Sequence, residues 1–334
     1  MNYIGSKYSL LDFLHSTIEK VTGITDGNGY VFADLFAGTG VVGSSYRENG
    51  WKVLSNDIQY YSYVLNKHYI ENSSAVSPQL MDHLLAIDGV EGFVYRNYCE
   101  GSNSGRLYFT DSNGKKCDAI RQELEQLHSN GSISNNEYYY CLASLINSID
   151  KYANTASVYG AFLKRIKQSA KKEFEFELLP LINGPVGEVY NEEINNLIGT
   201  IEGDVLYLDP PYNARQYCTN YHVLETIAKY DNPELHGKTG LRDYSKQKSD
   251  FCSRKTVLKA FEYLIKNAKF KYIFLSYNNE GLMSLEEIKN IMSKYGDYSF
   301  YTKDYHRFKA DKEENRNIKS DSTLEYLHCL KKES

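Results

Sequence analysis

The segment with the clearest chemical potential is Asp209-Pro210-Pro211-Tyr212, an acid and an aromatic residue on either side of two prolines. It could activate an exocyclic amine such as that of adenine, which is a poor nucleophile because its lone pair is delocalised into the ring. Two acceptors on the two N–H groups would favour a pyramidal nitrogen and free that lone pair. The carboxylate of Asp209 and the carbonyl of Pro210, fixed by the stiff Pro-Pro backbone, can supply them. Tyr212 can stack on the base. The alternative is a proline-stiffened loop without chemistry.

A second segment, Gly38-x-Gly40-x-x-Gly43, matches the fingerprint of dinucleotide-binding proteins. Glycines let the backbone approach a ligand closely, and the N-terminus of a following helix presents free N–H groups to a carboxylate or a phosphate. Asp57 stands nineteen residues after Gly38, where an acid can accept hydrogen bonds from ribose hydroxyls. This glycine loop predicts a nucleoside cofactor with an anionic group. The alternative is a strand–turn–helix corner that binds nothing.

Two residues beside the glycine loop favour S-adenosylmethionine, whose tail is an amino acid next to a sulfonium cation. Asp34 could pair with the cationic part, and Phe36 could lie against the cofactor. An NAD-dependent oxidoreductase is the alternative, because the glycines and Asp57 fit NAD as well. That reading gives no role to the Pro-Pro segment (Asp209–Tyr212), and the chain lacks an obvious His–Asp or Tyr–Lys catalytic pair.

Both segments follow apolar runs of the kind that form buried parallel strands. The run Tyr30–Ala37 enters the glycine loop, Trp51–Ser55 ends before Asp57, and Gly203–Asp209 enters the Pro-Pro segment. The other elements expected are helices over 8–21, 41–49 and from 57 to about 70, and strands near 271–276, 298–302 and 323–330. This alternation predicts an α/β fold with a doubly wound sheet.

Residues 71–185 interrupt the alternation with polar loops and two predicted helices, around 117–128 and 135–150. The remaining core needs far fewer residues than this gap contains. We therefore expect a catalytic domain of residues 1–70 and 186–334 with an inserted, mostly helical region of residues 71–185.

The formal net charge of −5 counts against a polyanionic partner, but the positive charges are clustered. The basic run, residues 164–172, contains five basic residues and no acidic one, among them Lys164, Arg165 and Lys167. A second stretch, 237–256, has six basic residues against two acidic ones. Such clusters fit contacts with nucleic-acid phosphates, and a solvated surface is the alternative.

The composition excludes several classes of protein. With 42% hydrophobic and 24% charged residues, the chain is neither disordered nor fibrous. The six cysteines form no C-x-x-C pair and have no histidine at metal-ligand spacing, so we expect reduced thiols and no metal. No apolar run approaches the roughly 20 residues that span a membrane, which predicts a soluble, cytoplasmic protein. The 31 tyrosines fit planar, polar ligands or a biased genome.

Together these motifs resemble those of adenine-N6 DNA methyltransferases in which the cofactor motif comes first, as in the Dam-like and restriction–modification enzymes. The matching segments are Tyr3–Lys7, Asp34–Gly40, Asp57, Val189–Glu193, Asp209–Tyr217, Tyr305–Lys309 and Glu325–Leu327. The resemblance implies a Rossmann-like, S-adenosylmethionine-dependent fold and in-line methyl transfer to N6 of a flipped adenine, without a covalent intermediate. It also implies double-stranded DNA as the partner and, in a restriction–modification system, a cognate endonuclease for the same site.

The resemblance further implies roles for single residues. The implied cofactor contacts are Tyr3, Lys7, Asp34, Phe36, Gly38, Gly40, Asp57, Glu193 and Asp209, and the implied DNA contacts are Lys164, Arg165, Lys167 and Arg215. Tyr3 and Lys7 would contact the methionine end of the cofactor, and Glu193 stands where the family often has an aspartate that touches the cofactor adenine. Residues 71–185 would recognise the target, and the last two motifs would form a terminal strand pair. The N-terminus resembles that of members that modify CATG.

Other methyltransferases remain as alternatives. Cytosine N4 poses the same chemical problem as adenine N6, although an aspartate at position 209 favours adenine. Enzymes that act on RNA or protein more often carry asparagine there and usually lack so large an insert. A nucleic-acid-binding module without activity would leave the glycine loop unexplained.

Overall fold

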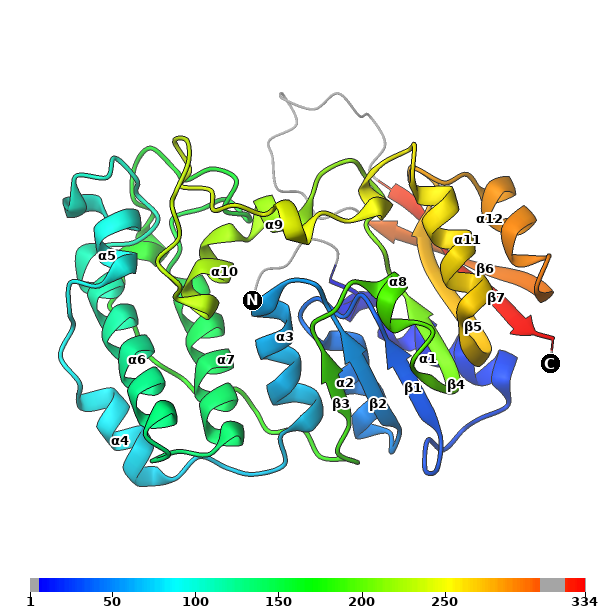
Figure 1. The fold of residues 1–334 in the computed structure, drawn as a ribbon, viewed down its shortest axis with the longest axis horizontal. Coiled ribbons are helices and arrows are strands. Elements are labelled where there is room, and N and C mark those ends of the chain that lie inside the picture. The colour runs from blue at the N-terminus through cyan, green and yellow to red at the C-terminus, as the bar shows by residue number, and fades with distance from the viewer. Residues whose placement is uncertain (1–5, 307–321, 334) are drawn as a thin grey trace. The chain divides into compact units, whose positions relative to one another are not determined.

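The structure, a computed structural model, describes residues 6–306 and 322–333. These residues form two compact units (Figure 1). The sheet unit comprises the described parts of Gly5–Ile58, Asn183–Gln216 and Gln247–Ser334, and the helical unit comprises Gln59–Ile182 and Tyr217–Lys246.

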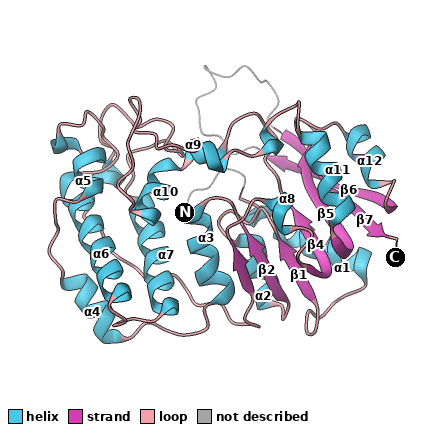
Figure 2. Ribbon diagram, in the orientation of Figure 1, coloured by secondary structure: helices cyan, strands magenta, loops and turns pink. Residues whose placement is uncertain are grey.

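In the described residues of the sheet unit, seven strands form one sheet in the order β3-β2-β1-β4-β5-β7-β6 (Figure 2). The strands are β1 Val31–Asp34, β2 Lys52–Asn56, β3 Glu188–Tyr190, β4 Glu202–Leu208, β5 Lys269–Asn278, β6 Gly296–His306 and β7 Ser322–Lys332. Neighbouring strands are parallel except β7, which is antiparallel to β5 and β6. The predicted α/β, doubly wound sheet is confirmed, and β6 and β7 are paired at its end.

Side chains alternate between the two faces of the sheet along each strand, so apolar side chains emerge on both faces. Helices cover both faces and bury these side chains. The helices are α1 Leu11–Thr22, α2 Val41–Glu48, α8 Ile194–Leu197, α11 Val257–Asn267 and α12 Leu285–Met292. Ala33 of β1 and Leu206 of β4 share a core with apolar residues of α8, α11 and α12. Phe32 points to the opposite face and stacks on Tyr46 of α2, with ring centroids 3.7 Å apart. Asp34 is two residues from Phe32 on β1, so its side chain lies on the same face of the sheet, the face that α2 covers.

The helical unit is built around a separate apolar core. Its helices are α3 Tyr60–Asn66, α4 Pro78–Ala86, α5 Phe93–Tyr98, α6 Asp111–Ser129, α7 Asn135–Lys151, α9 Tyr217–Asn220 and α10 His222–Lys229. The helices predicted around 117–128 and 135–150 correspond to α6 and α7. Ser134 begins α7 in a capping box with Glu137, the sequence signature of a helix start.

The two units differ in extent from the predicted domains of 1–70 with 186–334 and of 71–185. The helical unit begins at Gln59 and includes Tyr217–Lys246, which follows the Pro-Pro segment. The physical reason is α10, whose apolar side chains are buried in the core of the helical unit together with residues of α3 and α7. Contacts between segments so distant in the sequence leave no trace in local periodicity. The target-recognition role of 71–185 stays a prediction.

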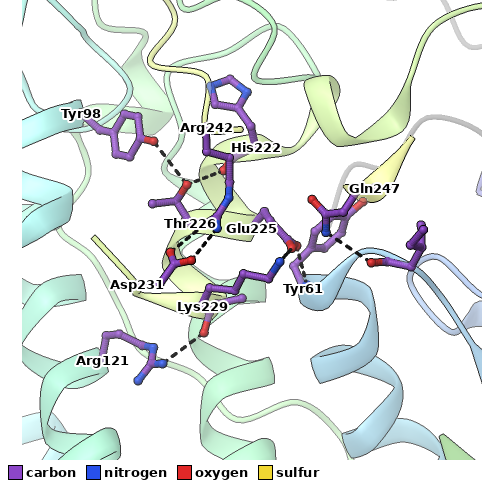
Figure 3. A network of polar contacts seen from close by, with 12 residues as sticks. Tyr61, Tyr98, Arg121, His222, Glu225, Thr226, Lys229, Asp231, Arg242 and Gln247 are labelled. Atoms are coloured by element: carbon purple, nitrogen blue, oxygen red, sulfur yellow. Dashed lines mark hydrogen bonds and ion pairs between the residues drawn. The ribbon is translucent and has the colours of Figure 1, made fainter. Parts of the chain in front are cut away.

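Polar contacts tie α10 to its neighbours within the helical unit (Figure 3). Arg121 of α6 donates from Nε to the carbonyl of Ile227 at 3.0 Å and from Nη2 to that of Ala228 at 3.1 Å. These carbonyls belong to the last turn of α10, where intrahelical donors are lacking. Glu225, 1% exposed, accepts the N–H of Tyr61 at the start of α3 at 2.9 Å. Arg121 therefore satisfies carbonyl groups at the C-terminal end of α10, and Glu225 satisfies an N–H group at the N-terminal end of α3.

Among the helices of residues 6–306 and 322–333, none has the length and apolar character needed to cross a membrane. The six cysteines are free thiols and all are buried.

Candidate active site

The order of the strands reverses between β1 and β4: β2 and β3 continue on one side of β1, and β4 and β5 on the other. In open α/β sheets, ligands bind outside the carboxyl ends of the strands at such a reversal. Asp34 is the last residue of β1, and Asp209 directly follows β4. The fold thus places the glycine loop and the Pro-Pro segment at the ends of two paired strands.

The glycine loop has a backbone that only glycine adopts without strain. Gly38 has φ 52° and Gly40 φ 77°, both in the left-handed region. The N–H of Gly38 donates to Oδ2 of Asp57, beyond the end of β2, at 2.9 Å, so this acid holds the loop in place. Gly40 is the N-cap of α2, and a helix N-terminus favours a bound anionic group. Phe36 meets Phe251 edge-on, with ring centroids 5.1 Å apart.

Asp34 is buried, with 1% of its surface exposed. Its Oδ2 accepts the N–H of Gly43, in the first turn of α2, at 3.2 Å, so the carboxylate caps that helix. Burial, reinforced by the negative charge of Asp209, raises the pKa of Asp34 to about 8. Its Oδ1 lies buried without a well-aligned hydrogen-bond donor in the part of the chain that the structure describes. The predicted pairing of Asp34 with a cofactor cation stays a prediction.

Asp57 and Glu193 lie near the ends of the paired strands β2 and β3. Asn191 Nδ2 donates to the backbone carbonyl of Asp57 at 2.7 Å and joins the two strand ends. Glu193 is the N-cap of α8, where its side chain accepts the N–H of Asn195 at 2.9 Å. Burial raises the pKa of Glu193. Glu193 thus has a local structural task, and its predicted contact with a cofactor stays a prediction.

The Pro-Pro segment is held firmly where it leaves β4. Pro210 is buried and Tyr212 is half-buried. The N–H of Leu282 donates to the backbone carbonyl of Tyr212 at 3.0 Å. The ring of Tyr277 meets that of Tyr212 edge-on at 6.2 Å between centroids, and Lys7 Nζ lies 5.7 Å from the Tyr212 ring centroid. These contacts fix both the direction of the segment and the plane of the Tyr212 ring.

Lys7 forms a buried bridge between two acids. Its Nζ lies 3.1 Å from Oδ1 of Asp209 and 2.9 Å from Oε1 of Glu325 on β7. The hydroxyl of Ser276, on β5, donates to the same Glu325 oxygen at 2.7 Å. Lys7 is 6% exposed and Glu325 4%. An ammonium ion and two carboxylates therefore share a site from which water is largely excluded.

These charges determine the protonation states at the site. Burial raises the pKa of Asp209, the ammonium of Lys7 lowers it and the carboxylate of Glu325 raises it, with a result of about 6. Burial lowers the pKa of Lys7, but Asp209 and Glu325 outweigh that effect and place it well above its usual value. At neutral pH, Asp209 is thus a carboxylate and Lys7 an ammonium.

The sequence placed Glu325 in a matching terminal segment but assigned it no role at the site, and Ser276 was missed. The available signal was the alternation along β7, in which Glu325 shares a face with the buried residues Leu327 and Cys329. A charged residue at a buried position of a strand is seldom retained without a partner.

The site has the properties that a cationic nucleoside cofactor requires. The glycines allow close backbone approach, and Asp57 stands at the end of the strand next to β1. Asp209 and Glu325 together outweigh the single positive charge of Lys7, and Asp34 keeps a buried carboxyl oxygen without a well-aligned donor. A positive group at this place would meet a negative potential.

The predicted DNA contacts fall in both units. Lys164 and Arg165 are exposed in the helical unit. Lys167 is half-buried, donates from Nζ to the carbonyl of Thr155 at 2.8 Å, and has its pKa lowered by burial. Arg215 is exposed in the loop after the Pro-Pro segment of the sheet unit. Lys164, Arg165 and Arg215 are therefore presented to solvent, whereas Lys167 is partly engaged.

The second basic stretch, 237–256, carries less available charge than its sequence indicates. Arg242 donates to both carboxylate oxygens of Asp231, at 3.0 and 2.6 Å. Arg254 binds Glu287, with one contact of 3.0 Å. Two of the six positive charges are thus neutralised by acids outside the stretch.

Two predictions lie outside the described residues: Tyr3 and the side chains of Tyr305–Lys309. Within 6–306 and 322–333, no group of three or more His, Cys, Asp or Glu side chains is arranged to hold a metal ion.

The chain matches known proteins over nearly its whole length. A family described as D12 class N6 adenine-specific DNA methyltransferase matches residues 3–291. The type II methyltransferase M.NlaIII of Neisseria lactamica is 50% identical and aligns over 99% of this chain and 99% of that protein. The type II methyltransferase M.CviAII of Paramecium bursaria Chlorella virus 1 is 35% identical over 93% of each chain. M.FokI of Planomicrobium okeanokoites is 40% identical over 93% of this chain, which spans 50% of that longer protein.

Proposed function

Because the chain belongs to the D12 class of N6 adenine-specific DNA methyltransferases, we propose that it is the modification enzyme of a type II restriction–modification system and methylates adenine within one short duplex site. The observation that carries this proposal is the position of Asp209 and Pro210 directly after β4, beside the glycine loop that follows β1. Relatives that are type II methyltransferases over their full length support it. The NAD-dependent oxidoreductase is set aside, because the family that matches residues 3–291 is one of DNA methyltransferases.

S-adenosylmethionine is the cofactor of this enzyme, and it supplies an electrophilic methyl group on a sulfonium. We assign its binding to the glycine loop, with Gly38 and Gly40 allowing close approach and Asp57 accepting from ribose hydroxyls. The cationic part of the cofactor would lower the pKa of Asp34 from about 8, so that Asp34 ionises and supplies negative charge for it. Lys7 has three N–H donors and meets two carboxylates, so one donor remains for the carboxylate of the cofactor.

The chain's own residues prepare the target amine for reaction. We propose that adenine leaves the duplex, stacks on Tyr212, and donates its two N6 hydrogens to the carboxylate of Asp209 and the carbonyl of Pro210. These hydrogen bonds favour a pyramidal nitrogen with an available lone pair. As N6 gains a methyl group it must lose a proton, and Asp209, with a pKa of about 6, is the nearest base.

We propose that the helical unit selects the DNA site. Its basic run contains Lys164 and Arg165, whose exposed side chains can contact phosphates whatever the base sequence. Lys167 is tied to the carbonyl of Thr155 and holds the run in place while it adds charge. Phosphate contacts of this kind supply affinity and register, and other side chains of the unit would read base edges.

Replacing Lys164, Arg165 and Lys167 together by glutamine should weaken duplex binding about tenfold near 0.15 M salt. Each lost phosphate contact lowers the slope of log K against log salt by about 0.9, so the slope should fall by roughly 2. Fluorescence anisotropy across a salt series measures both quantities.

A matched control replaces three exposed lysines of the sheet unit, Lys266 in the last turn of α11 and Lys269 and Lys271 at the amino-terminal end of β5. This triple variant loses the same charge and should keep the wild-type slope. If the wild type and the 164–167 variant have equal slopes of log K against log salt, the basic run does not contact DNA.

The reaction should slow below about pH 6, because Asp209 accepts hydrogen bonds from the amine only as a carboxylate. Its pKa of about 6 predicts that kcat/KM is constant above that pH and falls about tenfold per unit below it. Initial rates with a fixed duplex between pH 5 and 8 measure this. A rate that is constant down to pH 5 would show that Asp209 is not needed as an anion.

The function is tested by methylation-sensitive sequencing of plasmid DNA from cells that express the protein. The proposal expects N6-methyladenine in every copy of one short motif, and CATG is the first motif to examine. Resistance of that DNA to a restriction endonuclease of the same specificity would support the modification role. We propose a cytoplasmic location, where such DNA is reached. Methylation scattered without a motif would contradict the proposal.

A further inference from the structure

We infer that Glu325 is a positioning residue for methyl transfer: it shares the ammonium of Lys7, so that the carboxylate of Asp209 remains a strong hydrogen-bond acceptor and base for the target amine. The inference rests on the proposed function, in which Asp209 contacts adenine. It assigns a role to a residue outside the glycine loop and the Pro-Pro segment.

The geometry shows that Lys7 is divided between two acids. Its Nζ lies 2.9 Å from Oε1 of Glu325 and 3.1 Å from Oδ1 of Asp209, so the nearer partner is the residue that does not touch the base. Ser276 donates to the same oxygen of Glu325 at 2.7 Å and fixes that carboxylate. Lys7 thus approaches Asp209 at Oδ1, and we assign the acceptance of the N6 hydrogen to Oδ2.

The sheet fixes Glu325 in this place. In the antiparallel pair of β5 and β7, Glu325 is opposite Asn278, and Leu327 is opposite Ser276. Residues two apart on a strand share a face, so Ser276 and Glu325 are diagonal neighbours on one face of the sheet. The position of Glu325 therefore depends on backbone pairing and not on a flexible loop.

Charge sharing has a definite consequence for Asp209. With Glu325 neutral, Lys7 would have Asp209 as its sole ionic partner in this bridge, and a carboxylate tightly paired with an ammonium is a weaker acceptor and a weaker base. Asp34, at the end of β1, has a pKa of about 8 and is largely protonated at neutral pH, and burial raises the pKa of the Tyr207 phenol on β4, so neither group adds much negative charge. Glu325 is thus the group that balances Lys7 without touching the base.

Glu325→Gln tests this role with a nearly isosteric change. Lys7 keeps Asp209 as a partner, so no buried charge is left alone and the fold should persist. We expect kcat to fall about tenfold. Because the carboxylate of Glu325 raises the pKa of Asp209, the acid limb of kcat/KM should also move down by at least about 0.5 pH unit from its wild-type position near 6.

A second readout does not depend on turnover. A duplex with 2-aminopurine as the neighbour of an intact target adenine, bound in the presence of S-adenosylhomocysteine, becomes brighter when that adenine leaves the stack. Binding of the flipped adenine requires the same two acceptors, Asp209 and Pro210. In Glu325→Gln, the acid limb of the fluorescence signal should therefore move down in pH together with the acid limb of kcat/KM.

Two further variants make the series graded. Glu325→Asp keeps the negative charge but moves it away from Lys7 by the length of one methylene group. We therefore expect the acid limb of kcat/KM to move to lower pH by less than in Glu325→Gln. Ser276→Ala keeps all three charges and should leave the acid limb in place. Glu286→Gln, which removes an exposed glutamate from α12 in the same unit, should match wild type in every measurement.

An acid limb that stays at the wild-type pH in both Glu325 variants would overturn the inference and leave Glu325 a structural group. That outcome leaves the proposed function intact, because it is read on an active enzyme. Failure of the wild-type protein to methylate adenine would instead contradict the proposed function itself.

Discussion

Replacing Asp209 by alanine should lower the rate of methyl transfer to DNA by about 10³-fold or more. The change removes the acceptor that we assign to the target amine together with the nearest base, and loss of one preorganised polar contact at a reacting group typically costs 10²–10³-fold. Single-turnover transfer of labelled methyl groups to a duplex measures the effect without a contribution from product release.

The structure indicates that this variant will fold. Lys7 retains Glu325 at 2.9 Å, so its buried ammonium is not left unpaired. Binding of S-adenosylhomocysteine should change by less than about threefold, since the glycine loop and Asp57 are untouched. Asp297→Ala, at an exposed position of β6, removes one negative charge from the same unit and should have full activity. Methyl transfer that survives Asp209→Ala would disprove the assigned mechanism.

Tyr212→Ala should lower kcat/KM for DNA by about 10²-fold while leaving cofactor binding nearly unchanged. Stacking of a base on an aromatic side chain contributes roughly 1–3 kcal/mol, and the ring of Tyr212 is held beside Lys7 by the edge-on contact with Tyr277. Rates with a duplex substrate and calorimetric titration with S-adenosylhomocysteine separate the two effects.

Tyr212→Phe is the matched control, because it keeps the stacking face and removes the hydroxyl alone. It should retain most of the activity. Equal losses of DNA methylation and cofactor binding in Tyr212→Ala would place this ring against the cofactor and not against the flipped base.

The parts of the fold that could be predicted from the sequence are those whose requirements lie in contiguous residues. Gly38 and Gly40 are glycines because the turn after β1 needs left-handed backbone there. The run Gly203–Asp209 reads as a buried strand, and the two prolines end it at the reversal of the sheet. Such local signals were sufficient for the α/β, doubly wound class and for the family, and both predictions are confirmed.

The features that could not be predicted depend on pairing across the fold. Lys7 and Glu325 are 318 residues apart in the sequence and meet only because β7 inserts beside β5. Arg242 is a basic residue in the printed sequence, yet its charge is matched by Asp231. A count of charges along the chain cannot reveal such partners, so neither the buried bridge nor the reduced charge of 237–256 could be inferred from spacing.

Asp34 shows an intermediate case. Its place in the first strand was inferred from the apolar run Tyr30–Ala37, and the structure ends that strand at Asp34. Its hydrogen bond to Gly43 was not inferred, because capping depends on how α2 folds back over the strand end. The same carboxylate can cap the helix through one oxygen and face a cation with the other, which is how we reconcile the two roles.

The most direct test of the central claim identifies the methylated base itself. Purified protein is incubated with unmethylated duplex DNA and S-adenosylmethionine that carries a deuterated methyl group, and the DNA is digested to nucleosides for mass spectrometry. We expect labelled N6-methyladenine in wild-type reactions and none with Asp209→Ala. Label in N4-methylcytosine, or no label in DNA at all, would contradict it.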